Sequence, residues 1–304
     1  MNCALCGRAC GVDRATGEIG FCAMGELPAL ARAALHHWEE PCISGTRGSG
    51  AVFFSGCSLR CGYCQNYEIS HMRFGTEVDV ARLREIFEEL IDQGAHNINL
   101  INPTHFVPAI LRALGRKLPV PVVYNSHGYD GLQALRALKG KIDIYLPDLK
   151  YFYKLPARRY SGVEDYFEIA SRAIDEMVAQ VGPPVMDGDG LMRSGVLIRH
   201  LLLPLQAEGA MRIIDHVKAR YGERVLFSLM RQYTPNAISA RYPEIDRRVT
   251  EEEYAQVERY LFDSGLEGFV QEDGSADAAY LPAFDLSGVL PKEEDPFGAL
   301  GGEG

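Results

Sequence analysis

The sequence predicts an α/β protein whose main domain is a partial barrel of six β/α units, with a small cysteine-rich metal-binding cap before it and a C-terminal extension after it. Short apolar runs alternate with segments that have apolar residues at helical spacing, which is typical of buried parallel strands joined by helices. All eight cysteines lie within the first 64 of the 304 residues, at positions 3, 6, 10, 22, 42, 57, 61 and 64. We expect the cap and a linker at 1–50, the barrel at 51–235, and a helix and tail at 236–304.

The composition is that of a folded globular protein, with 47% hydrophobic and 24% charged residues. The formal net charge of -10 argues against nucleic acid or an anionic membrane as a partner, because both require a positive surface. Neither a signal peptide nor a membrane-spanning pattern is evident. Cysteines gathered at one end indicate metal binding in a reducing compartment, so we expect a cytoplasmic protein.

The N-terminal cap contains four cysteines, Cys3, Cys6, Cys10 and Cys22, with glycines beside them. Glycine lets the backbone turn tightly around a metal and direct amides at the sulfur atoms. Four thiolates form a closed site, which suits structural zinc or a second [4Fe-4S] cluster used in electron relay. The sequence leaves both alternatives open.

Residues 26–50 are expected to form a linker or the edge of a lid. Their glycine spacing resembles a phosphate loop, but such loops follow a strand and open a helix, whereas this segment precedes the strand expected at 51–56. Cys42, His36 and His37 are expected to be packed or solvent-facing rather than ligands.

The most informative stretch is a Cys-x3-Cys-x2-Cys motif formed by Cys57, Cys61 and Cys64 directly after an apolar run. Three thiolates on one short loop can converge on a metal centre but cannot all pair as disulfides. Structural zinc takes four protein ligands, whereas a cubane iron-sulfur cluster held by three cysteines leaves one iron open. The open iron favours a catalytic cluster; a zinc knuckle or a chance grouping of cysteines is the alternative.

Strand and helix patterns then alternate along the chain. The expected strands are 51–56, 97–102, 120–124, 142–146, 196–203 and 225–230, and the expected helices between them are 80–93, 105–116, 130–138, 163–181 and 207–220. A last helix at 249–262 begins with a capping box formed by Thr250 and Glu253, and a short strand is expected at 266–270. From Asp285 the composition turns to glycine, proline and acidic residues, so we expect this tail to pack loosely.

Polar residues follow or end each expected barrel strand. Because active sites of parallel barrels form at the carboxyl ends of the strands, these residues are the candidates for binding. They are Asn102, Thr104 and His105 after the second strand, Asn125 and Ser126 at the third, Asp148 and Lys150 after the fourth, Arg199 and His200 on the fifth, and 231–235 after the sixth.

The cysteine motif, with Tyr63 directly before its last cysteine, resembles the signature of the radical S-adenosylmethionine (SAM) enzymes, and the chain is similar to the branch that contains the activating enzyme of pyruvate formate-lyase. The resemblance implies a radical SAM barrel in which Cys57, Cys61 and Cys64 hold a [4Fe-4S] cluster that binds the amino and carboxylate groups of SAM. It implies an oxidoreductase in which one electron cleaves SAM to methionine and a 5'-deoxyadenosyl radical, which abstracts hydrogen from a substrate.

The same resemblance implies partners and alternatives. A low-potential donor, flavodoxin or ferredoxin, would supply electrons, and a glycyl radical enzyme is one candidate for a protein substrate. A radical SAM enzyme that acts on a small metabolite is the first alternative, and a non-catalytic iron-sulfur or zinc protein is the second. Similar four-cysteine openings to that of the cap occur in this branch.

The resemblance also assigns SAM contacts to individual residues. Arg199 matches an arginine that helps to hold SAM, and Asp148 with Lys150 matches an Asp-x-Lys near the methionyl group. Asn125 and Ser126 are similar to the Thr-Asn-Gly end of a family strand.

One departure from the family pattern concerns the SAM amino group. The family has Gly-Gly-Glu where this chain has Asn-Pro-Thr-His at 102–105, so Thr104 is the remaining candidate acceptor. Arg199 and His200 should face opposite ways, because side chains alternate along a strand. Arg199 must find an anion in so apolar a strand, either the SAM carboxylate or a protein carboxylate such as Asp148.

Overall fold

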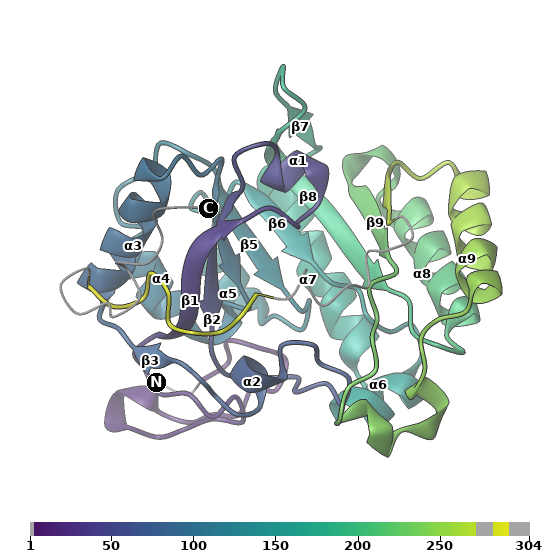
Figure 1. Cartoon of the computed structure of the whole chain (residues 1–304), viewed down its shortest axis with the longest axis horizontal. Helices are drawn as coiled ribbons and strands as arrows, with labels where there is room; N and C mark the ends of the chain where they lie inside the picture. The colour runs from purple at the N-terminus through teal and green to yellow at the C-terminus, as the bar shows by residue number, and fades with distance from the viewer. Residues whose placement is uncertain (1–2, 272–281, 292–304) are drawn as a thin grey trace.

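The computed structural model describes residues 3–271 and 282–291, and the six expected barrel strands form one curved parallel sheet (Figure 1). These strands are β2 (Ser49–Phe54), β4 (Ile98–Ile101), β5 (Val122–Ser126), β6 (Ile144–Pro147), β8 (Met192–Leu201) and β9 (Leu226–Met230). The order along the sheet is β10-β9-β8-β6-β5-β4-β2-β1-β3, so the barrel is open. The predicted partial barrel is confirmed.

The register of the sheet brings the carboxyl ends of the strands together. Leu100 pairs with Val52 on one side and with Tyr124 on the other, and Tyr124 pairs with Tyr145. Strands β2 and β5 are buried along their whole length, as expected for parallel strands covered on both faces. Residues that follow neighbouring strands therefore meet at one end of the sheet.

Helices pack against the outer face of the sheet. They are α3 (Val80–Asp92), α4 (Val107–Ala113), α5 (Leu132–Ala137), α6 (Lys154–Ser161), α7 (Tyr166–Val181), α8 (Ala207–Arg220) and α9 (Glu251–Ser264), with short helices α1 (Pro41–Ser44) and α2 (Tyr67–Ser70) in loops. The α3 helix begins at Asp79, whose side chain accepts a hydrogen bond from the Arg82 amide, and it buries Leu83, Phe87 and Leu90. No helix in the described part of the chain is both long and apolar enough to cross a bilayer.

The structure has four further strands: β1 (Ala29–His36), β3 (Thr76–Glu77), β7 (Val185–Met186) and β10 (Gly268–Val270). Of these, the sequence predicted only β10, as the short strand at 266–270. The prediction of a linker at 26–50 is wrong for the residues of β1. This strand pairs antiparallel with β2, from Leu30↔Phe54 to His36↔Ser49. Alanine has low strand propensity, and burial against β2 outweighs it here. The β10 strand pairs with β9, so both flanking parts of the chain join the barrel sheet. The division at residues 50 and 235 stays a prediction.

The C-terminal part confirms one expectation and corrects another. The capping box of Thr250 and Glu253 at the start of α9 is present. The loose tail expected from Asp285 is wrong up to residue 291: Asp285 forms a 3.0 Å ion pair with Arg32, and Arg82 donates hydrogen bonds to the backbone carbonyls of Val289 and Leu290. Residues 292–304 lie outside the described part of the chain.

Candidate active site

The three motif cysteines lie on the loop that follows β2, residues 55–66, here called the cysteine loop. Cys57 and Cys61 are buried and Cys64 is half-buried. Each sulfur accepts a hydrogen bond: Cys57 from the Leu59 amide at 3.4 Å, Cys61 from the Ser161 hydroxyl at 3.0 Å, and Cys64 from the Ser70 hydroxyl at 3.2 Å. Donors directed at sulfur stabilise thiolates, so the set fits a thiolate-ligated iron-sulfur cluster.

Burial opposes ionisation of these thiols when nothing is bound to them. It raises the pKa of Cys57 to about 12 and that of Cys64 to about 11, and the charge of Cys61 adds to both shifts. Three thiolates at this position therefore require a positive centre among them. Within residues 3–271 and 282–291, no three His, Cys, Asp or Glu side chains are grouped in a way that would hold a single metal ion.

Residues at the ends of β4 and β5 hold the backbone of the cysteine loop. Asn102 donates a 2.5 Å hydrogen bond from its amide nitrogen to the Gly56 carbonyl, and His105 Nε2 contacts the Ser55 carbonyl at 2.7 Å. His127 Nε2 contacts the Ser58 hydroxyl at 2.9 Å. Burial lowers the pKa of both histidines to about 3, so both are neutral near pH 7. These polar strand ends shape the loop instead of facing a ligand.

A cavity of about 800 Å³ occupies the inside of the partial barrel. Cys61, Tyr63 and Cys64 line it, and so do Asn125, Asp148, Lys150 and Arg199 from β5, from the segment after β6 and from β8. Seven of the predicted site residues are therefore brought together around one cavity. The ring of Tyr63 is itself surrounded by the rings of Tyr151, Tyr160 and Tyr233, with centroids 6.0 to 6.3 Å away.

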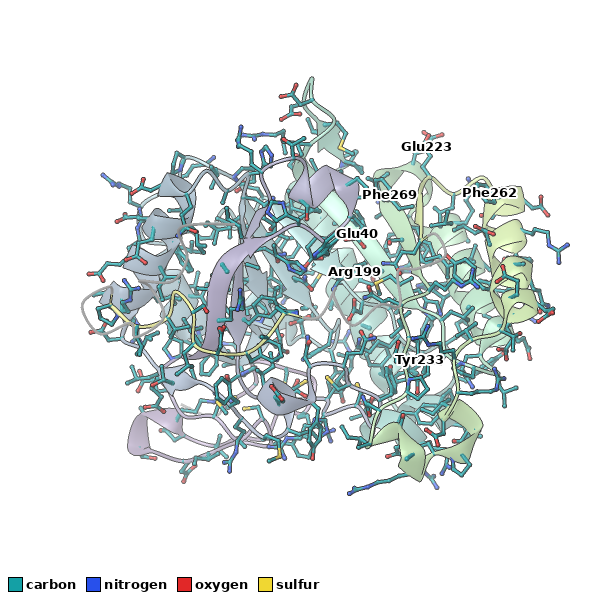
Figure 2. The ribbon with its side chains drawn as sticks, in the orientation of Figure 1. Glu40, Arg199, Glu223, Tyr233, Phe262 and Phe269 are labelled. Carbon is teal, nitrogen blue, oxygen red and sulfur yellow. The ribbon has the colours of Figure 1, made fainter. Side chains whose placement is uncertain are left out.

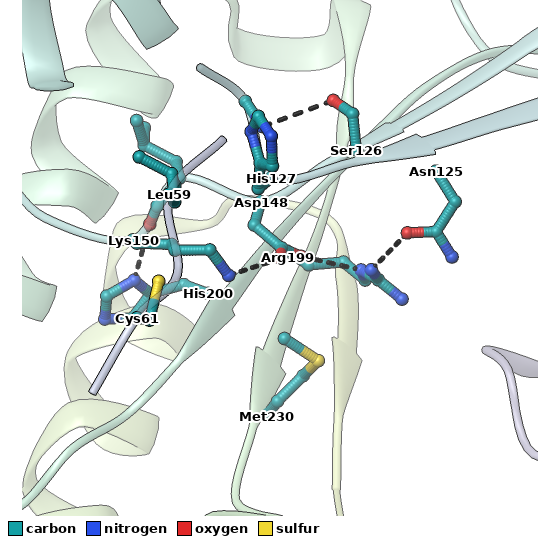
Figure 3. Close-up of polar contacts among 12 residues, drawn as sticks. Leu59, Cys61, Asn125, Ser126, His127, Asp148, Lys150, Arg199, His200 and Met230 are labelled. Atoms are coloured by element: carbon teal, nitrogen blue, oxygen red, sulfur yellow. Dashed lines mark hydrogen bonds and ion pairs between the residues drawn. The ribbon is translucent and has the colours of Figure 1, made fainter. Parts of the chain in front are cut away.

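Two cations and two carboxylates form a continuous charge network along the cavity wall, and Figure 3 shows three of its members, Lys150, Asp148 and Arg199. Lys150 Nζ lies 2.6 Å from Asp148 Oδ2, and Arg199 Nε lies 3.1 Å from Asp148 Oδ1. Arg199 also contacts Glu39 Oε2 at 3.0 Å and donates a 2.6 Å hydrogen bond to Asn125 Oδ1. Although burial opposes it, the charges of Lys150 and Arg199 lower the pKa of Asp148. The protein ion pair, which the sequence left open as the alternative for Arg199, is present.

Two predicted SAM contacts do not reach the cavity. The Thr104 and Ser126 hydroxyls both donate to the buried Asp130 carboxylate, at 2.7 and 2.6 Å. The expectation that these hydroxyls face SAM is therefore not met, because Asp130 takes both of them in the protein interior. His200 points away from the cavity as expected and contacts the Leu149 carbonyl through Nδ1 at 2.7 Å.

Sequence reasoning missed the two glutamates that contribute to the cavity from the β1–β2 connection, Glu39 and Glu40. They lie outside the six β/α units, so the search at strand ends did not include them. The available signal was a pair of carboxylates directly before Pro41 in an otherwise apolar segment. His36 and His37 also line the cavity, whereas Cys42 is buried as expected.

The four cap cysteines are close enough to influence one another. Burial raises the pKa of Cys6 to about 11, with added contributions from the charges of Cys22 and Cys3, and Cys3 hydrogen-bonds Cys10. Arg14 donates a 2.9 Å hydrogen bond to the Cys22 sulfur. Cys10 is exposed, whereas the other three are buried.

Comparisons with known proteins show what the barrel part of the chain is similar to. Residues 51–190, which include the cysteine loop, match the sequence model of the Radical SAM superfamily. The uncharacterized protein MJ0674 of Methanocaldococcus jannaschii is 29% identical over 270 residues, which cover 86% of this chain and 73% of that protein.

Two crystal structures of SuiB from Streptococcus suis share the fold. The structure bound to S-adenosylmethionine has a TM-score of 0.50 at 13% identity and covers 73% of this chain, and another has 0.51 at 12% and covers 75%. This chain spans about half of each SuiB chain, 50% and 49%. The family match, which spans the cysteine loop and most of the barrel, identifies residues 51–190 as a radical SAM domain.

Proposed function

We propose that the chain cleaves SAM reductively at the cysteine loop and uses the resulting 5'-deoxyadenosyl radical to abstract hydrogen from a substrate in the 800 Å³ cavity. The radical SAM domain at residues 51–190 implies a [4Fe-4S] cluster and SAM. The cluster, when bound, supplies the electron for the cleavage. The observation that supports the proposal is the placement of Cys61 and Cys64 in the wall of a cavity that also contains the charge network.

The residues of the charge network have different roles in this proposal. Lys150 lies near the cysteine loop, close enough for the charges of Cys61 and Cys64 to raise its pKa. Its ammonium group has three N–H donors, and the pair with Asp148 uses one of them. In this proposal Lys150 binds the SAM carboxylate. Arg199 is already matched by two carboxylates, so it orients Asp148, whose remaining lone pairs can accept from the SAM ammonium group.

We propose that the cap holds a second metal through Cys3, Cys6, Cys10 and Cys22. Arg8 Nε donates a 2.7 Å hydrogen bond to the Ser58 carbonyl, so the cap packs directly on the cysteine loop. This contact favours a [4Fe-4S] cluster that passes electrons from a low-potential donor, flavodoxin or ferredoxin, over structural zinc. The exposed Cys10 is the side from which a donor would approach.

Two kinds of substrate are compatible with this proposal, a protein and a small metabolite. A glycyl radical enzyme would present a backbone glycine, whereas a small metabolite would enter the cavity whole. A cytoplasmic location stays a prediction. The non-catalytic alternative predicts metal binding without turnover of SAM.

The test is anaerobic reconstitution with iron and sulfide, followed by metal analysis and measurement of 5'-deoxyadenosine after reduction. Replacing Cys57, Cys61 and Cys64 by Ala should abolish 5'-deoxyadenosine and remove one metal centre while the cap keeps its own. A fully loaded protein that leaves SAM intact under strong reductant would instead support the non-catalytic alternative. Electron paramagnetic resonance of a co-incubated glycyl radical enzyme separates the protein substrate from the metabolite.

A further inference from the structure

Arg8 of the cap reaches two separate parts of the barrel. Its Nε donates a 2.7 Å hydrogen bond to the Ser58 carbonyl in the cysteine loop, and its terminal nitrogens donate to the Ser161 carbonyl at 2.9 Å and the Gly162 carbonyl at 3.3 Å. In Figure 1 the cap, drawn in purple, and α6 lie at the same end of the barrel, and Figure 2 places Arg199 above them. One guanidinium therefore joins the cap, the cysteine loop and the end of α6.

The acceptors that Arg8 meets at α6 need a donor from outside the helix. The last carbonyls of an α-helix have no partner within it, and cationic side chains commonly satisfy them. Arg8 does so from a distant part of the chain, and its guanidinium also lies 3.6 Å from the centre of the Phe21 ring. A guanidinium presents five N–H donors in one plane, so it spans several carbonyls in a way that an ammonium group cannot.

The two serines whose carbonyls Arg8 holds both direct their hydroxyls at cysteine sulfurs. The Ser161 hydroxyl donates to Cys61 at 3.0 Å, and the Ser58 hydroxyl hydrogen-bonds Cys6 of the cap. The ring of His127 accepts a hydrogen bond from a backbone amide at Nδ1, so the neutral ring carries its proton on Nε2 and donates it to Ser58 Oγ at 2.9 Å. The hydrogen of the Ser58 hydroxyl is then left for the sulfur of Cys6.

We propose that Arg8 is the positioning residue through which the metal-bound cap controls the cluster of the cysteine loop. Arg8 lies between Cys6 and Cys10, so a metal held by the cap cysteines fixes the segment that carries it. Once fixed, the guanidinium holds the end of α6 and keeps the Ser161 hydroxyl against the Cys61 sulfur. The inference rests on the proposed function, because it requires metal at both sites, and it applies to zinc in the cap as well as to a second cluster.

The hydrogen bond from Ser161 makes the cluster easier to reduce, because it withdraws negative charge from a ligating sulfur. When the cap is empty, Arg8 no longer fixes the end of α6, the contact with Cys61 loosens and the reduction potential falls. Electrons then reach the cysteine loop readily only in protein whose cap is loaded.

The first test is Arg8→Lys, which keeps the positive charge and so separates positioning from electrostatics. In reconstituted protein it should lower the midpoint potential of the loop cluster, in the direction of Ser161→Ala. A redox titration followed by electron paramagnetic resonance measures the shift, and the signal of the loop cluster is the one that disappears when the three loop cysteines are replaced by Ala. Arg158→Lys is the matched control, because Arg158 lies in the last turn of the same helix but pairs with Glu164 at 3.0 Å on the surface. It should leave the potential unchanged.

A double change tests whether Arg8 acts through Ser161. In a Ser161→Ala background Arg8→Lys should cause no further shift, because the hydroxyl that Arg8 positions is gone. An equal shift in both backgrounds overturns the inference, and so does a wild-type potential in loaded Arg8→Lys.

Cys10→Ala tests the link to the cap metal and keeps the inference falsifiable if Arg8→Lys does not fold. Cys10 is the exposed cysteine of the cap, so its loss should empty the cap with the least disturbance of packing. The loop cluster should then have a lowered potential, with no such shift when Ser161 is already Ala. A wild-type potential beside an empty cap overturns the inference. Because these measurements need no SAM cleavage, failure of the proposed function appears separately, as loaded wild-type protein that forms no 5'-deoxyadenosine.

Discussion

The Ser161 hydroxyl donates a 3.0 Å hydrogen bond to the sulfur of Cys61, although 100 positions separate the two residues. Ser161 is the last residue of α6, and Tyr151 contacts the same hydroxyl at 2.7 Å. The contact joins the cysteine loop to the far side of the barrel. It also gives the barrel a means of adjusting the electron density on a metal-bound sulfur.

We predict that Ser161→Ala lowers the reduction potential of the cluster held by the cysteine loop. Loss of a hydrogen bond to a thiolate leaves more negative charge on the sulfur, so adding an electron becomes harder. The free energy of unfolding should fall by about 1 kcal/mol. A redox titration followed by electron paramagnetic resonance measures the shift, with Ser171→Ala as a buried-serine control whose hydroxyl has no hydrogen-bond partner in the described part of the chain. An unchanged potential in Ser161→Ala would contradict the prediction.

Gly56→Ala should prevent assembly of the cluster on the cysteine loop. Gly56 has φ of 79°, and a Cβ there would lie 2.4 Å from Met24 Cγ and 2.7 Å from the Cys22 carbonyl oxygen. The cap would be pushed away from the loop. The control is Gly140→Ala, which has φ of 75° with nothing within 4 Å of the added Cβ, so it shares the backbone strain without the collision. Iron content after reconstitution measures the effect, and normal loading of Gly56→Ala would show that close docking of the cap is unnecessary.

Arg199→Ala should destabilise the protein strongly and weaken SAM binding while the cluster still assembles. Removing the guanidinium leaves buried Glu39 without a cation and Asp148 with Lys150 as its remaining cation, and breaking a buried pair in this way costs about 3–5 kcal/mol. The double change Arg199→Ala with Glu39→Gln should lose less stability, because one unpaired charge is removed as well. Chemical denaturation and SAM titration measure the two effects. Wild-type SAM affinity in folded Arg199→Ala would exclude Arg199 from the SAM site, directly or through Asp148.

The start of α9 should become less stable in acid. Glu253 accepts hydrogen bonds from Arg247 and from the Thr250 amide, and these partners lower its pKa to about 2 from an ordinary value of 4.5. Because the folded value is the lower one, this stability is complete above pH 4.5 and is lost as the pH falls toward 2. Thermal melts of wild type and Glu253→Gln from pH 7 to pH 2 should converge at the acid end. A constant difference between them across this range would refute the assignment.

The features that the sequence predicted best are those that depend on the spacing of residues close together in the chain. Cys57, Cys61 and Cys64 lie within eight residues, and the loop that they define follows a strand visible as an apolar run. Asp148, Lys150 and Arg199 were found because strand ends of a parallel sheet meet at one edge. Each of these predictions needed only the spacing of residues along the chain and the succession of strands and helices.

The residues that were placed wrongly depend on contacts between distant segments. Thr104 has the expected position after β4, but whether its hydroxyl turns to the cavity is decided by Asp130, which accepts from it. The alanine-rich β1 has low strand propensity of its own and forms because β2 pairs with it. Glu40 reaches the cavity only because that pairing returns the chain across the amino end of the barrel.

The β1–β2 connection and the cysteine loop lie at opposite ends of β2, yet both contribute side chains to one cavity. The cysteine loop and the residues that support it are at the carboxyl end, whereas Glu40 and Trp38 come from a hairpin at the opposite end. Exchanging residues 37–48 would therefore change the lining of the cavity without changing the cysteine loop, provided that a carboxylate is kept at Glu39 to balance Arg199. The hairpin is therefore a natural segment to randomise when the cavity is to be reshaped without touching the cysteine motif.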